Sequence, residues 1–246
     1  MEQVVELRHK NEFEKLLADY HVSDHAKEVL GSTKVVLLVG LAAGGRNSII
    51  NGLVATGHYH YLVSDTTRPP KLRDGKMEEE GVQYFFRSEE DLLEDLRHGE
   101  FLEAEIIHAQ QVSGISIREL ERANSADKIV VNEVEIGGAE AVYKLKDDTR
   151  CIFIIPPSFG EWQKRLANRE KISDQEFKNR MRTAKRNLRF ALAHDHYTFV
   201  INDDLNSAVT HLDKIARSGH DDERHEVRAR DVAASFLEEL NTLLAS

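Results

Sequence analysis

A glycine-rich segment early in the chain has the residue types and spacing of a phosphate-binding loop. The apolar run at residues 35–39 is followed by Gly40, Gly44 and Gly45. Because glycine lacks a Cβ and adopts positive φ easily, successive backbone N–H groups can turn toward one anion. Residues 46–55 have helical spacing, and the N-terminus of a helix attracts negative charge. The segment therefore predicts a strand, a phosphate-binding loop and a helix.

The residues after these glycines differ from the usual P-loop pattern. That pattern places a lysine and then a Ser or Thr hydroxyl directly after the second glycine. Arg46 and Asn47 stand at these positions, and Ser48 follows one place later. We expect Arg46 to serve as the cation of the loop, and Asn47 or Ser48 to help place Mg²⁺. A glycine turn without any nucleotide remains the alternative for this stretch taken alone.

A second polar segment, SDTTRPPK at residues 64–71, could also bind phosphate. Two prolines directly after Arg68 stop regular structure, so Ser64, Arg68 and Lys71 lie on a rigid connection. A guanidinium binds two phosphate oxygens at once, and hydroxyl groups can share them. A polar turn with incidental charges is the simpler explanation. The acidic residues at 78–80, which follow, are expected to form a solvated loop.

A cluster of basic residues follows the last strongly apolar run. Residues 164–189 hold ten Lys or Arg and three acids. Arg165 and Arg169 are four residues apart on a predicted helix, and Arg180 lies on the next one. Three converging arginines would form a mobile cationic lid over phosphates. A charge-rich helix pair facing solvent is an equally good explanation of this segment alone.

Four glutamates stand at the ends or on the faces of predicted strands. The run from Ile129 turns acidic at Glu133 and Glu135, just before two glycines and a helix. Ligands of open α/β sheets bind at that end of the strands, and an acid there could hold Mg²⁺ through water. Glu103 and Glu105 alternate with apolar residues and share one strand face, for which exposure to solvent is the simpler explanation.

The whole chain indicates one sizeable α/β domain with helices added at both ends. Its 246 residues can bury a core that needs no cross-links. The single cysteine, Cys151, lies in an apolar run and is expected to be a core residue. The first thirty residues and the apolar stripe of residues 232–244 predict terminal helices, which could pack on the domain or join two subunits in a homodimer.

Composition excludes several classes of function. The formal net charge of −10 disfavours a nucleic-acid-binding protein, which should carry a broad basic face. No apolar run is long enough to cross a membrane, and no signal-like N-terminus is present. We therefore expect a soluble, cytoplasmic protein that acts on small anionic ligands.

Together, the order of these motifs resembles that of guanylate kinases from about residue 34 to residue 216. The shared features are the glycine loop, SxTTRxP, GVxYxF, EFLE, an acidic strand end before GG, PPS, Arg-x3-Arg and VINDDL. The resemblance implies a P-loop NTPase-type parallel sheet flanked by helices, with a small mixed-strand subdomain for the nucleoside monophosphate. It implies an N-terminal extension at 1–33, a kinase-like domain at 34–217 and a C-terminal helix at 218–246. The monophosphate subdomain would span 65–118, and the lid 161–190.

The resemblance also implies roles for individual residues. The GMP pocket would contain Ser64, Arg68, Lys71, Tyr84, Glu103 and Glu133. ATP would bind at Gly40, Gly44, Gly45, Arg46, Asn47 and Ser48, with Arg165, Arg169 and Arg180 closing over its phosphates. Mg²⁺ would lie near Asn47, Ser48, Glu133 and Glu135. Val112 and Gly114 fall where the family has a phosphate-binding tyrosine and a base-contacting serine, and Ser113 and Ser116 are close enough to substitute for them.

Two functions follow from this resemblance. The first is a phosphotransferase of purine nucleotide metabolism that moves the γ-phosphoryl of ATP to a nucleoside monophosphate, GMP or dGMP, with Mg²⁺. The three lid arginines favour it, because they would serve the phosphoryl donor. The second is a catalytically inactive guanylate-kinase-like module that binds GMP or a phosphorylated protein partner, which the altered residues Arg46 and Asn47 would explain.

Overall fold

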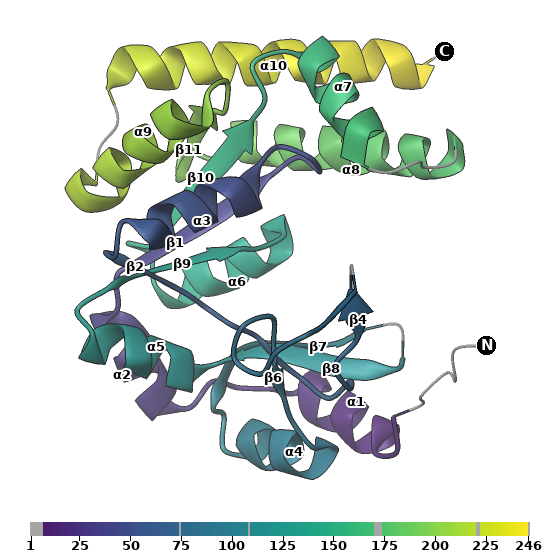
Figure 1. Cartoon of the computed structure of the whole chain (residues 1–246), viewed down its shortest axis with the longest axis vertical. Helices are drawn as coiled ribbons and strands as arrows, with labels where there is room; N and C mark the ends of the chain where they lie inside the picture. Colours follow the sequence, from purple (N-terminus) through teal and green to yellow (C-terminus); the bar gives the residue numbers. More distant parts are fainter. Residues whose placement is uncertain (1–6, 74, 108, 170–173, 220–221, 246) are drawn as a thin grey trace. The chain divides into compact units, whose positions relative to one another are not determined.

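Residues 7–73, 75–107, 109–169, 174–219 and 222–245 are described by the computed structural model of the protein. Internal contacts divide the chain into two units, each built from separate stretches. The smaller unit consists of Met1–Lys34 and Tyr61–Val130, and the larger unit of Val35–His60 and Val131–Ser246. Figure 1 shows the elements of both units, coloured along the sequence.

The larger unit contains a five-stranded sheet with the order β11-β10-β1-β9-β2. The strands are β1 (Val35–Gly40), β2 (Tyr59–Tyr61), β9 (Ile129–Glu133), β10 (Arg150–Ile155) and β11 (Tyr197–Ile201). β1, β10 and β11 pair in parallel, and β1 is buried along its whole length. Helices cover both faces of parallel sheets, which explains why the predicted core strands are continuous apolar runs. The predicted α/β fold with a parallel sheet is confirmed.

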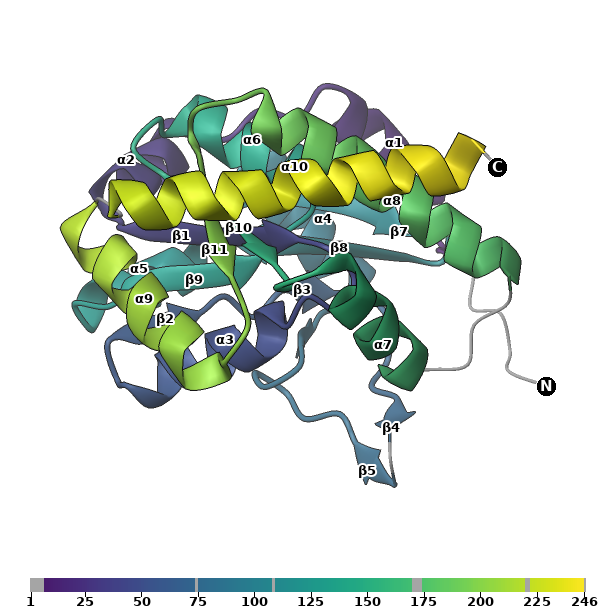
Figure 2. The same cartoon turned by 90° about the horizontal axis from the view of Figure 1, so that it is seen from above.

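Within its described residues, the larger unit has six helices. They are α3 (Arg46–Ala55), α6 (Ile136–Leu145), α7 (Phe159–Arg169), α8 (Asp174–Leu192), α9 (Leu205–Ser218) and α10 (Glu223–Ala245). α10, drawn in yellow, lies along α8 and β11 (Figures 1 and 2). Phe236 and Leu240 of its apolar stripe are buried. The C-terminal helix thus packs on its own chain, and a homodimer through the terminal helices stays a prediction.

α10 also closes the open edge of the sheet. β11 is the edge strand, so one side of its backbone has no neighbouring strand. The Glu226 carboxylate accepts a hydrogen bond from the backbone N–H of Phe199 at 3.0 Å, and the Arg230 guanidinium donates to the carbonyl of Tyr197 at 2.7 Å. Edge strands that expose these groups invite pairing with other chains. Two side chains of the added helix therefore satisfy the edge of the sheet.

The smaller unit is built on a four-stranded sheet with the order β6-β3-β8-β7. Its strands are β3 (Asp65–Thr66), β6 (Phe85–Phe86), β7 (Phe101–Ile107) and β8 (Gln111–Ser116), and β4 (Leu72–Arg73) and β5 (Lys76–Met77) form a separate hairpin. The sheet is mixed, because β3 pairs in parallel with β6 and antiparallel with β8. The unit's helices are α1 (Lys10–Ala18), α2 (Asp24–Ser32), α4 (Glu89–Arg97) and α5 (Ile117–Ser125).

One face of this sheet is covered by α1 and α4. Phe13, Leu92, Phe101 and Val112 are fully buried members of the resulting apolar cluster. Because side chains of a strand alternate between faces, Ser113 points to the opposite face from Val112. The same alternation on β7 places Glu103 and Glu105 together on one face, as predicted from the sequence.

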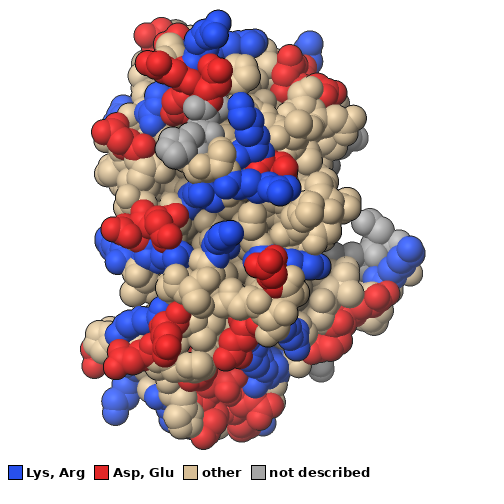
Figure 3. Space-filling view, turned by 90° about the vertical axis from the view of Figure 1, so that its left-hand side faces the viewer, with Lys and Arg blue, Asp and Glu red and all other residues tan. Residues whose placement is uncertain are grey.

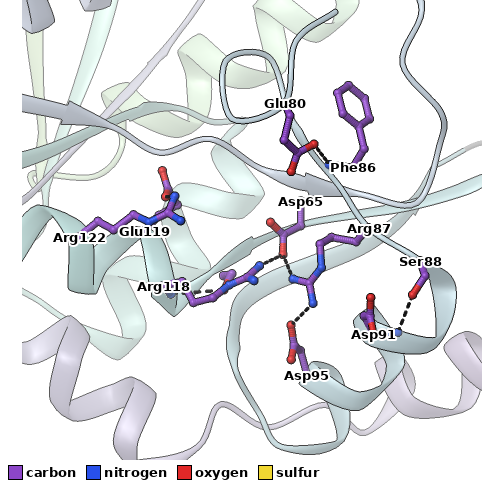
Figure 4. Close-up of polar contacts among 11 residues, drawn as sticks. Asp65, Glu80, Phe86, Arg87, Ser88, Asp91, Asp95, Arg118, Glu119 and Arg122 are labelled. Atoms are coloured by element: carbon purple, nitrogen blue, oxygen red, sulfur yellow. Dashed lines mark hydrogen bonds and ion pairs between the residues drawn. The ribbon is translucent and has the colours of Figure 1, made fainter.

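An ion-pair cluster around the buried Asp65 holds β3 within this sheet (Figure 4). Asp65 is fully buried, and its Oδ2 accepts hydrogen bonds from Arg87 at 3.0 Å and from Arg118 at 2.5 Å. Arg87 also donates to Asp95 of α4 at 3.0 Å. Burial raises the pKa of the Asp65 carboxyl, and the two arginines oppose this shift. The cluster ties β3 to α4 and α5, so it fixes the strand that leads into Thr67 and Arg68.

Three general expectations can be compared with the structure. In the part of the chain that is described, no helix is both long and apolar enough to span a bilayer. Cys151 is buried, as expected, and burial raises the pKa of its thiol to about 12, so it is not a nucleophile. On the face in Figure 3, acidic side chains interrupt the basic ones, and among the described residues there is no continuous basic surface on that face.

Candidate functional site

The glycine loop connects β1 to α3, and two of its glycines are required by their surroundings. A Cβ on Gly40 would lie 2.4 Å from the Ile154 carbonyl oxygen of the neighbouring strand β10. Gly45 has a φ of 95°, and a Cβ there would lie 2.1 Å from Nδ2 of Asn202. Any side chain at either position would displace β10 or the end of β11. The close packing of the loop thus accounts for both glycines.

The loop surrounds a cavity of about 310 Å³. Its lining is Leu41, Ala43, Gly44, Gly45, Arg46, Asn47 and Ser48. Five of the six residues predicted to bind ATP are therefore brought around one cavity at the N-terminus of α3, where a helix attracts anions. The sixth, Gly40, lines a neighbouring cavity.

The neighbouring cavity, of about 160 Å³, brings together residues from the loop, from α8 and Glu135, which precedes α6. Arg46, Glu135 and Arg180 all line it. Nε of Arg180 donates to Glu176 at 3.0 Å within α8. This cavity therefore joins the loop cation to one of the predicted lid arginines and to one of the predicted acidic residues.

The guanidinium of Arg46 is directed toward the end of β9. Its Nη1 donates to the carbonyl of Val134 at 3.2 Å. Its Nε and Nη2 lie 4.0 Å from Glu133 and 3.9 Å from Glu135, which are long ion pairs. Because Arg46 lines both cavities, its charge lies between them. The predicted loop cation is thus held by the acidic strand end, which sequence reasoning treated as a separate feature.

Of the other two predicted lid arginines, Arg165 is placed differently. Arg165 donates from Nε to Glu161 at 2.9 Å and from Nη1 to the carbonyl of Asn202 at 2.9 Å, so it ties α7 to the residue after β11. It lines neither of the two cavities. The side chain of Arg169 and the predicted lid residues 170–173 lie outside the described part of the chain.

In the smaller unit, Arg68 forms a buried pair with Glu78. Its Nη1 and Nη2 lie 2.5 and 2.9 Å from the two carboxylate oxygens, and the side chains are only 8% and 2% exposed. The hydrogen bonds with Glu78 raise the pKa of Arg68 further, so the guanidinium stays charged. Glu78 was expected in a solvated loop, and that expectation is wrong. The buried carboxylate also accepts a hydrogen bond from the backbone N–H of Lys71 at 3.0 Å.

Two aromatic rings fix the plane of the Arg68 guanidinium. Its Cζ lies 4.6 Å from the ring centroid of Tyr84 and 5.8 Å from that of Phe86. A cation over an aromatic face is attracted by the ring, more strongly where water is excluded. The predicted residues Arg68 and Tyr84 are therefore in direct contact, while the Lys71 side chain is exposed.

The open face of the small sheet carries the remaining predicted residues. Glu103 is half-buried there; burial raises the pKa of its carboxyl, and Glu105 nearby adds to the shift. Ser113 donates to the hydroxyl of Thr66 at 2.8 Å on the same face. Ser64 precedes β3, and its carbonyl accepts from Phe85 at 2.9 Å. Val112 is in the core, so Ser113 is the residue of this pair that lies on the open face.

Comparisons with known proteins agree with this arrangement. The family model for guanylate kinase matches residues 32–218, more than half of the chain. The chain belongs to the guanylate kinase family. A guanylate kinase of Sulfurimonas denitrificans is 31% identical over 184 residues, covering 74% of this chain and 86% of that protein. One from Pseudomonas fluorescens is 33% identical over 189 residues, covering 76% and 88%.

The fold agrees with a solved guanylate kinase structure as well. The crystal structure of guanylate kinase from Anaplasma phagocytophilum superposes with a TM-score of 0.54 at 23% identity, covering 84% of this chain and 97% of that one. The match to the guanylate kinase family model leaves α1 and α10 outside its limits. α1 packs on the smaller unit and α10 on the larger one.

Sequence reasoning missed three residues that the structure connects to the predicted ones. Glu78 pairs with Arg68, Asn202 packs on Gly45, and Trp162 contacts the glycine loop. Only Asn202 had a signal in the sequence, because it lies in the VINDDL motif. Glu78 and Trp162 are recognised only when distant parts of the chain are brought together.

Proposed function

We propose that this chain transfers the γ-phosphoryl group of ATP to GMP, giving ADP and GDP. The observation that carries the proposal is the match of the guanylate kinase family model across residues 32–218. The geometry of the glycine loop supports a phosphate-binding role for the larger unit. The buried arginine and the carboxylate face of the small sheet support an acceptor-binding role for the smaller unit.

On the donor side, we propose that the chain positions ATP and supplies positive charge around its phosphates. Phosphoryl transfer passes through a loose transition state that spreads charge over the phosphoryl oxygens, so little covalent chemistry is asked of the protein. The backbone N–H groups of Ala43 and Gly45 and the cations Arg46 and Arg180 belong to residues that line the two cavities where a triphosphate would lie. Arg165 would act mainly by holding α7 in place.

On the acceptor side, Arg68 would bind the phosphate of GMP. Its end-on edge is taken by Glu78 and the Pro69 carbonyl, and its side chain also hydrogen-bonds with Tyr84, so a phosphate would approach beside the Tyr84 hydroxyl. The edge formed by Nε and Nη2 would meet two phosphate oxygens there. Tyr84 and Lys71 would add further contacts to the phosphate. Glu103 would accept hydrogen bonds from the N–H groups of guanine, with Ser64 and Glu133 completing the predicted set.

The donor groups present fit a magnesium ion, which prefers oxygen ligands. Asn47 and Ser48 line the glycine-loop cavity, and the carboxylates of Glu133 and Glu135 lie at the end of β9. These four residues would hold Mg²⁺, directly or through water. When bound, the ion would neutralise charge on the phosphates of ATP. Because the reaction uses ATP, we also propose a cytoplasmic location and a role in purine nucleotide metabolism.

The direct test is turnover with a panel of acceptors. Purified protein with ATP and Mg²⁺ is offered GMP, dGMP, IMP, AMP, CMP and UMP, and the diphosphate product is measured. We expect GMP to be the best acceptor and the pyrimidine monophosphates to be inactive. Absence of product with every acceptor, together with absence of ATP binding by calorimetry, would contradict the proposal.

We expect the affinity for GMP to begin falling at a higher pH than it would with a glutamate of ordinary pKa. Guanine N–H groups need the charged carboxylate of Glu103 as acceptor, and burial raises its pKa. Protonation on lowering the pH through that raised pKa should therefore increase the KM for GMP. The measurement is KM between pH 4.5 and 8 for the wild type and for Glu103→Gln. The variant lacks this carboxyl, so its KM should be higher and should change with pH only as the phosphate of GMP titrates, which it does in both proteins; identical profiles would exclude Glu103.

One observation favours the second function, a catalytically inactive module that binds GMP or a phosphorylated protein. Arg46 is engaged by Val134 and lies near two glutamates, although an active loop cation has to reach the phosphates of ATP. In that case calorimetry would detect GMP binding at the smaller unit, and no acceptor would yield a product. The acceptor panel therefore separates the two functions.

A further inference from the structure

The single tryptophan of the chain contacts the glycine loop from its buried side. Trp162 lies on α7 and is fully buried. Its indole Nε1–H donates a hydrogen bond to the carbonyl of Ala42 at 2.8 Å. Residue 42 is in the middle of the loop, between β1 and the glycines that begin α3. A buried side chain of another helix is thus bonded to the backbone of the loop itself.

A second buried side chain holds the loop two residues further on. Nδ2 of Asn202, at the end of β11, donates to the carbonyl of Gly44 at 2.9 Å. Between these two anchored carbonyls lies Ala43, a non-glycine residue with a φ of 59°. This left-handed conformation is unfavourable for alanine and persists only where its surroundings enforce it. A turn bond from the Gly44 N–H to the Leu41 carbonyl at 2.9 Å spans Ala43, and the two side-chain hydrogen bonds hold the carbonyls on either side of it.

The direction of these carbonyls determines where the loop N–H groups point. In a trans peptide unit the C=O and the following N–H point in opposite directions. Since the carbonyls of Ala42 and Gly44 face buried donors, the N–H groups of Ala43 and Gly45 face the other way, toward the cavity that these residues line. Neither N–H has a hydrogen-bond partner among the described residues. Two donors are thus presented to an anion.

The C-terminal helix supplies part of the pocket that holds the indole. The ring of Phe236 on α10 lies 6.2 Å from that of Trp162, and Phe159 lies 5.5 Å from Trp162 and 5.7 Å from Phe236, measured between centroids. Phe236 is buried. α10 lies beyond residue 218, where the match to the guanylate kinase family ends.

We propose that Trp162 is a positioning residue of the glycine loop, and that α10 holds it in place through Phe236. The added C-terminal helix then serves the donor site, because the orientation of two phosphate-binding N–H groups depends on it. The inference rests on the proposed function in that the loop binds the phosphates of ATP. It is tested by binding, so it does not depend on turnover.

The test compares ATP affinities by calorimetry in Trp162→Phe, Phe236→Leu and the wild type. Trp162→Phe keeps an aromatic ring but removes the five-membered ring of the indole with its N–H, so the Ala42 carbonyl loses its anchor. We expect ATP to bind about fivefold to tenfold more weakly, which is the usual net worth of one such hydrogen bond. Affinity for GMP should not change. Val227→Ala, on an exposed part of α10, is the matched control and should match the wild type.

A second measurement reads the loop contact directly. With one tryptophan in the chain, the ¹⁵N–¹H spectrum contains a single indole resonance. We expect this proton to exchange slowly with solvent, to shift when ATP is added and not when GMP is added, and to exchange faster in Phe236→Leu. A tryptophan that only fills the core would not respond to ATP.

The outcomes separate this inference from the proposed function. ATP binding without turnover, weakened in Trp162→Phe, would support the inference and contradict the kinase. Wild-type affinity for ATP in a folded Trp162→Phe variant, or an indole resonance unmoved by ATP, would overturn the inference and leave the kinase standing. Failure of the wild type to bind ATP would overturn both.

Discussion

Arg68→Ala is expected to raise the KM for GMP by about a hundredfold or more and to destabilise the smaller unit. Truncating one partner of a buried, hydrogen-bonded charge pair typically costs about 2 to 5 kcal/mol in binding. The loss of folding stability has a separate cause: Glu78 is 2% exposed, and without Arg68 its charge is buried and uncompensated. Such a change typically costs about 3 to 5 kcal/mol. GMP titrations and urea unfolding measure the two effects independently.

The double variant Arg68→Ala/Glu78→Ala separates stability from binding. It removes both charges, so most of the stability lost in Arg68→Ala should return, whereas GMP affinity should stay low because the phosphate still lacks its guanidinium. Glu78→Gln is the matched single variant; it keeps the shape of the side chain and leaves Arg68 present. Recovery of GMP affinity in the double variant would show that Arg68 does not bind the phosphate.

The core strands of the larger unit could be predicted from the sequence because burial on both faces leaves a continuous apolar run. Residues 35–39 and the run around Cys151 are of this kind, and both form strands of the sheet. The position of Glu133 at a strand end followed from the same reasoning. The pattern of apolar residues shows which residues of an element are buried. The ends of a predicted strand then show where its loops begin.

Contacts between distant residues could not be predicted in the same way. Three consecutive glutamates at 78–80 look alike in the sequence, but only Glu78 is buried, because only its side chain reaches Arg68. The sequence comparison placed Val112 at the position of a phosphate-binding tyrosine. A shift of one residue along a strand moves the side chain to the other face of the sheet. Val112 therefore lies in the core, and its neighbour Ser113 lies on the face opposite α1 and α4. Trp162 was not singled out from the sequence, because its hydrogen bond to the Ala42 carbonyl joins residues 120 positions apart.

Arg46→Ala is expected to lower kcat by about a hundredfold to a thousandfold while leaving the affinity for GMP unchanged. Removing one preorganised group that stabilises transition-state charge typically has an effect of about this size. The variant should fold normally. The ion pairs of Arg46 with Glu133 and Glu135 are long, at 4.0 and 3.9 Å, and such partly exposed pairs contribute about 0 to 1 kcal/mol. Single-turnover kinetics with saturating ATP and GMP measure the loss.

Arg46→Lys shows whether the loop needs this particular cation. A lysine restores the residue of the usual P-loop pattern, and its single ammonium cannot engage the Val134 carbonyl and both glutamates at once as the guanidinium does. We therefore expect its charge to turn toward the glycine-loop cavity and kcat to stay within about tenfold of the wild type, since the charge itself is kept. Equal kcat in Arg46→Ala and the wild type would instead make Arg46 a structural partner of β9, and the charge at the triphosphate would have to come from Arg180 on α8.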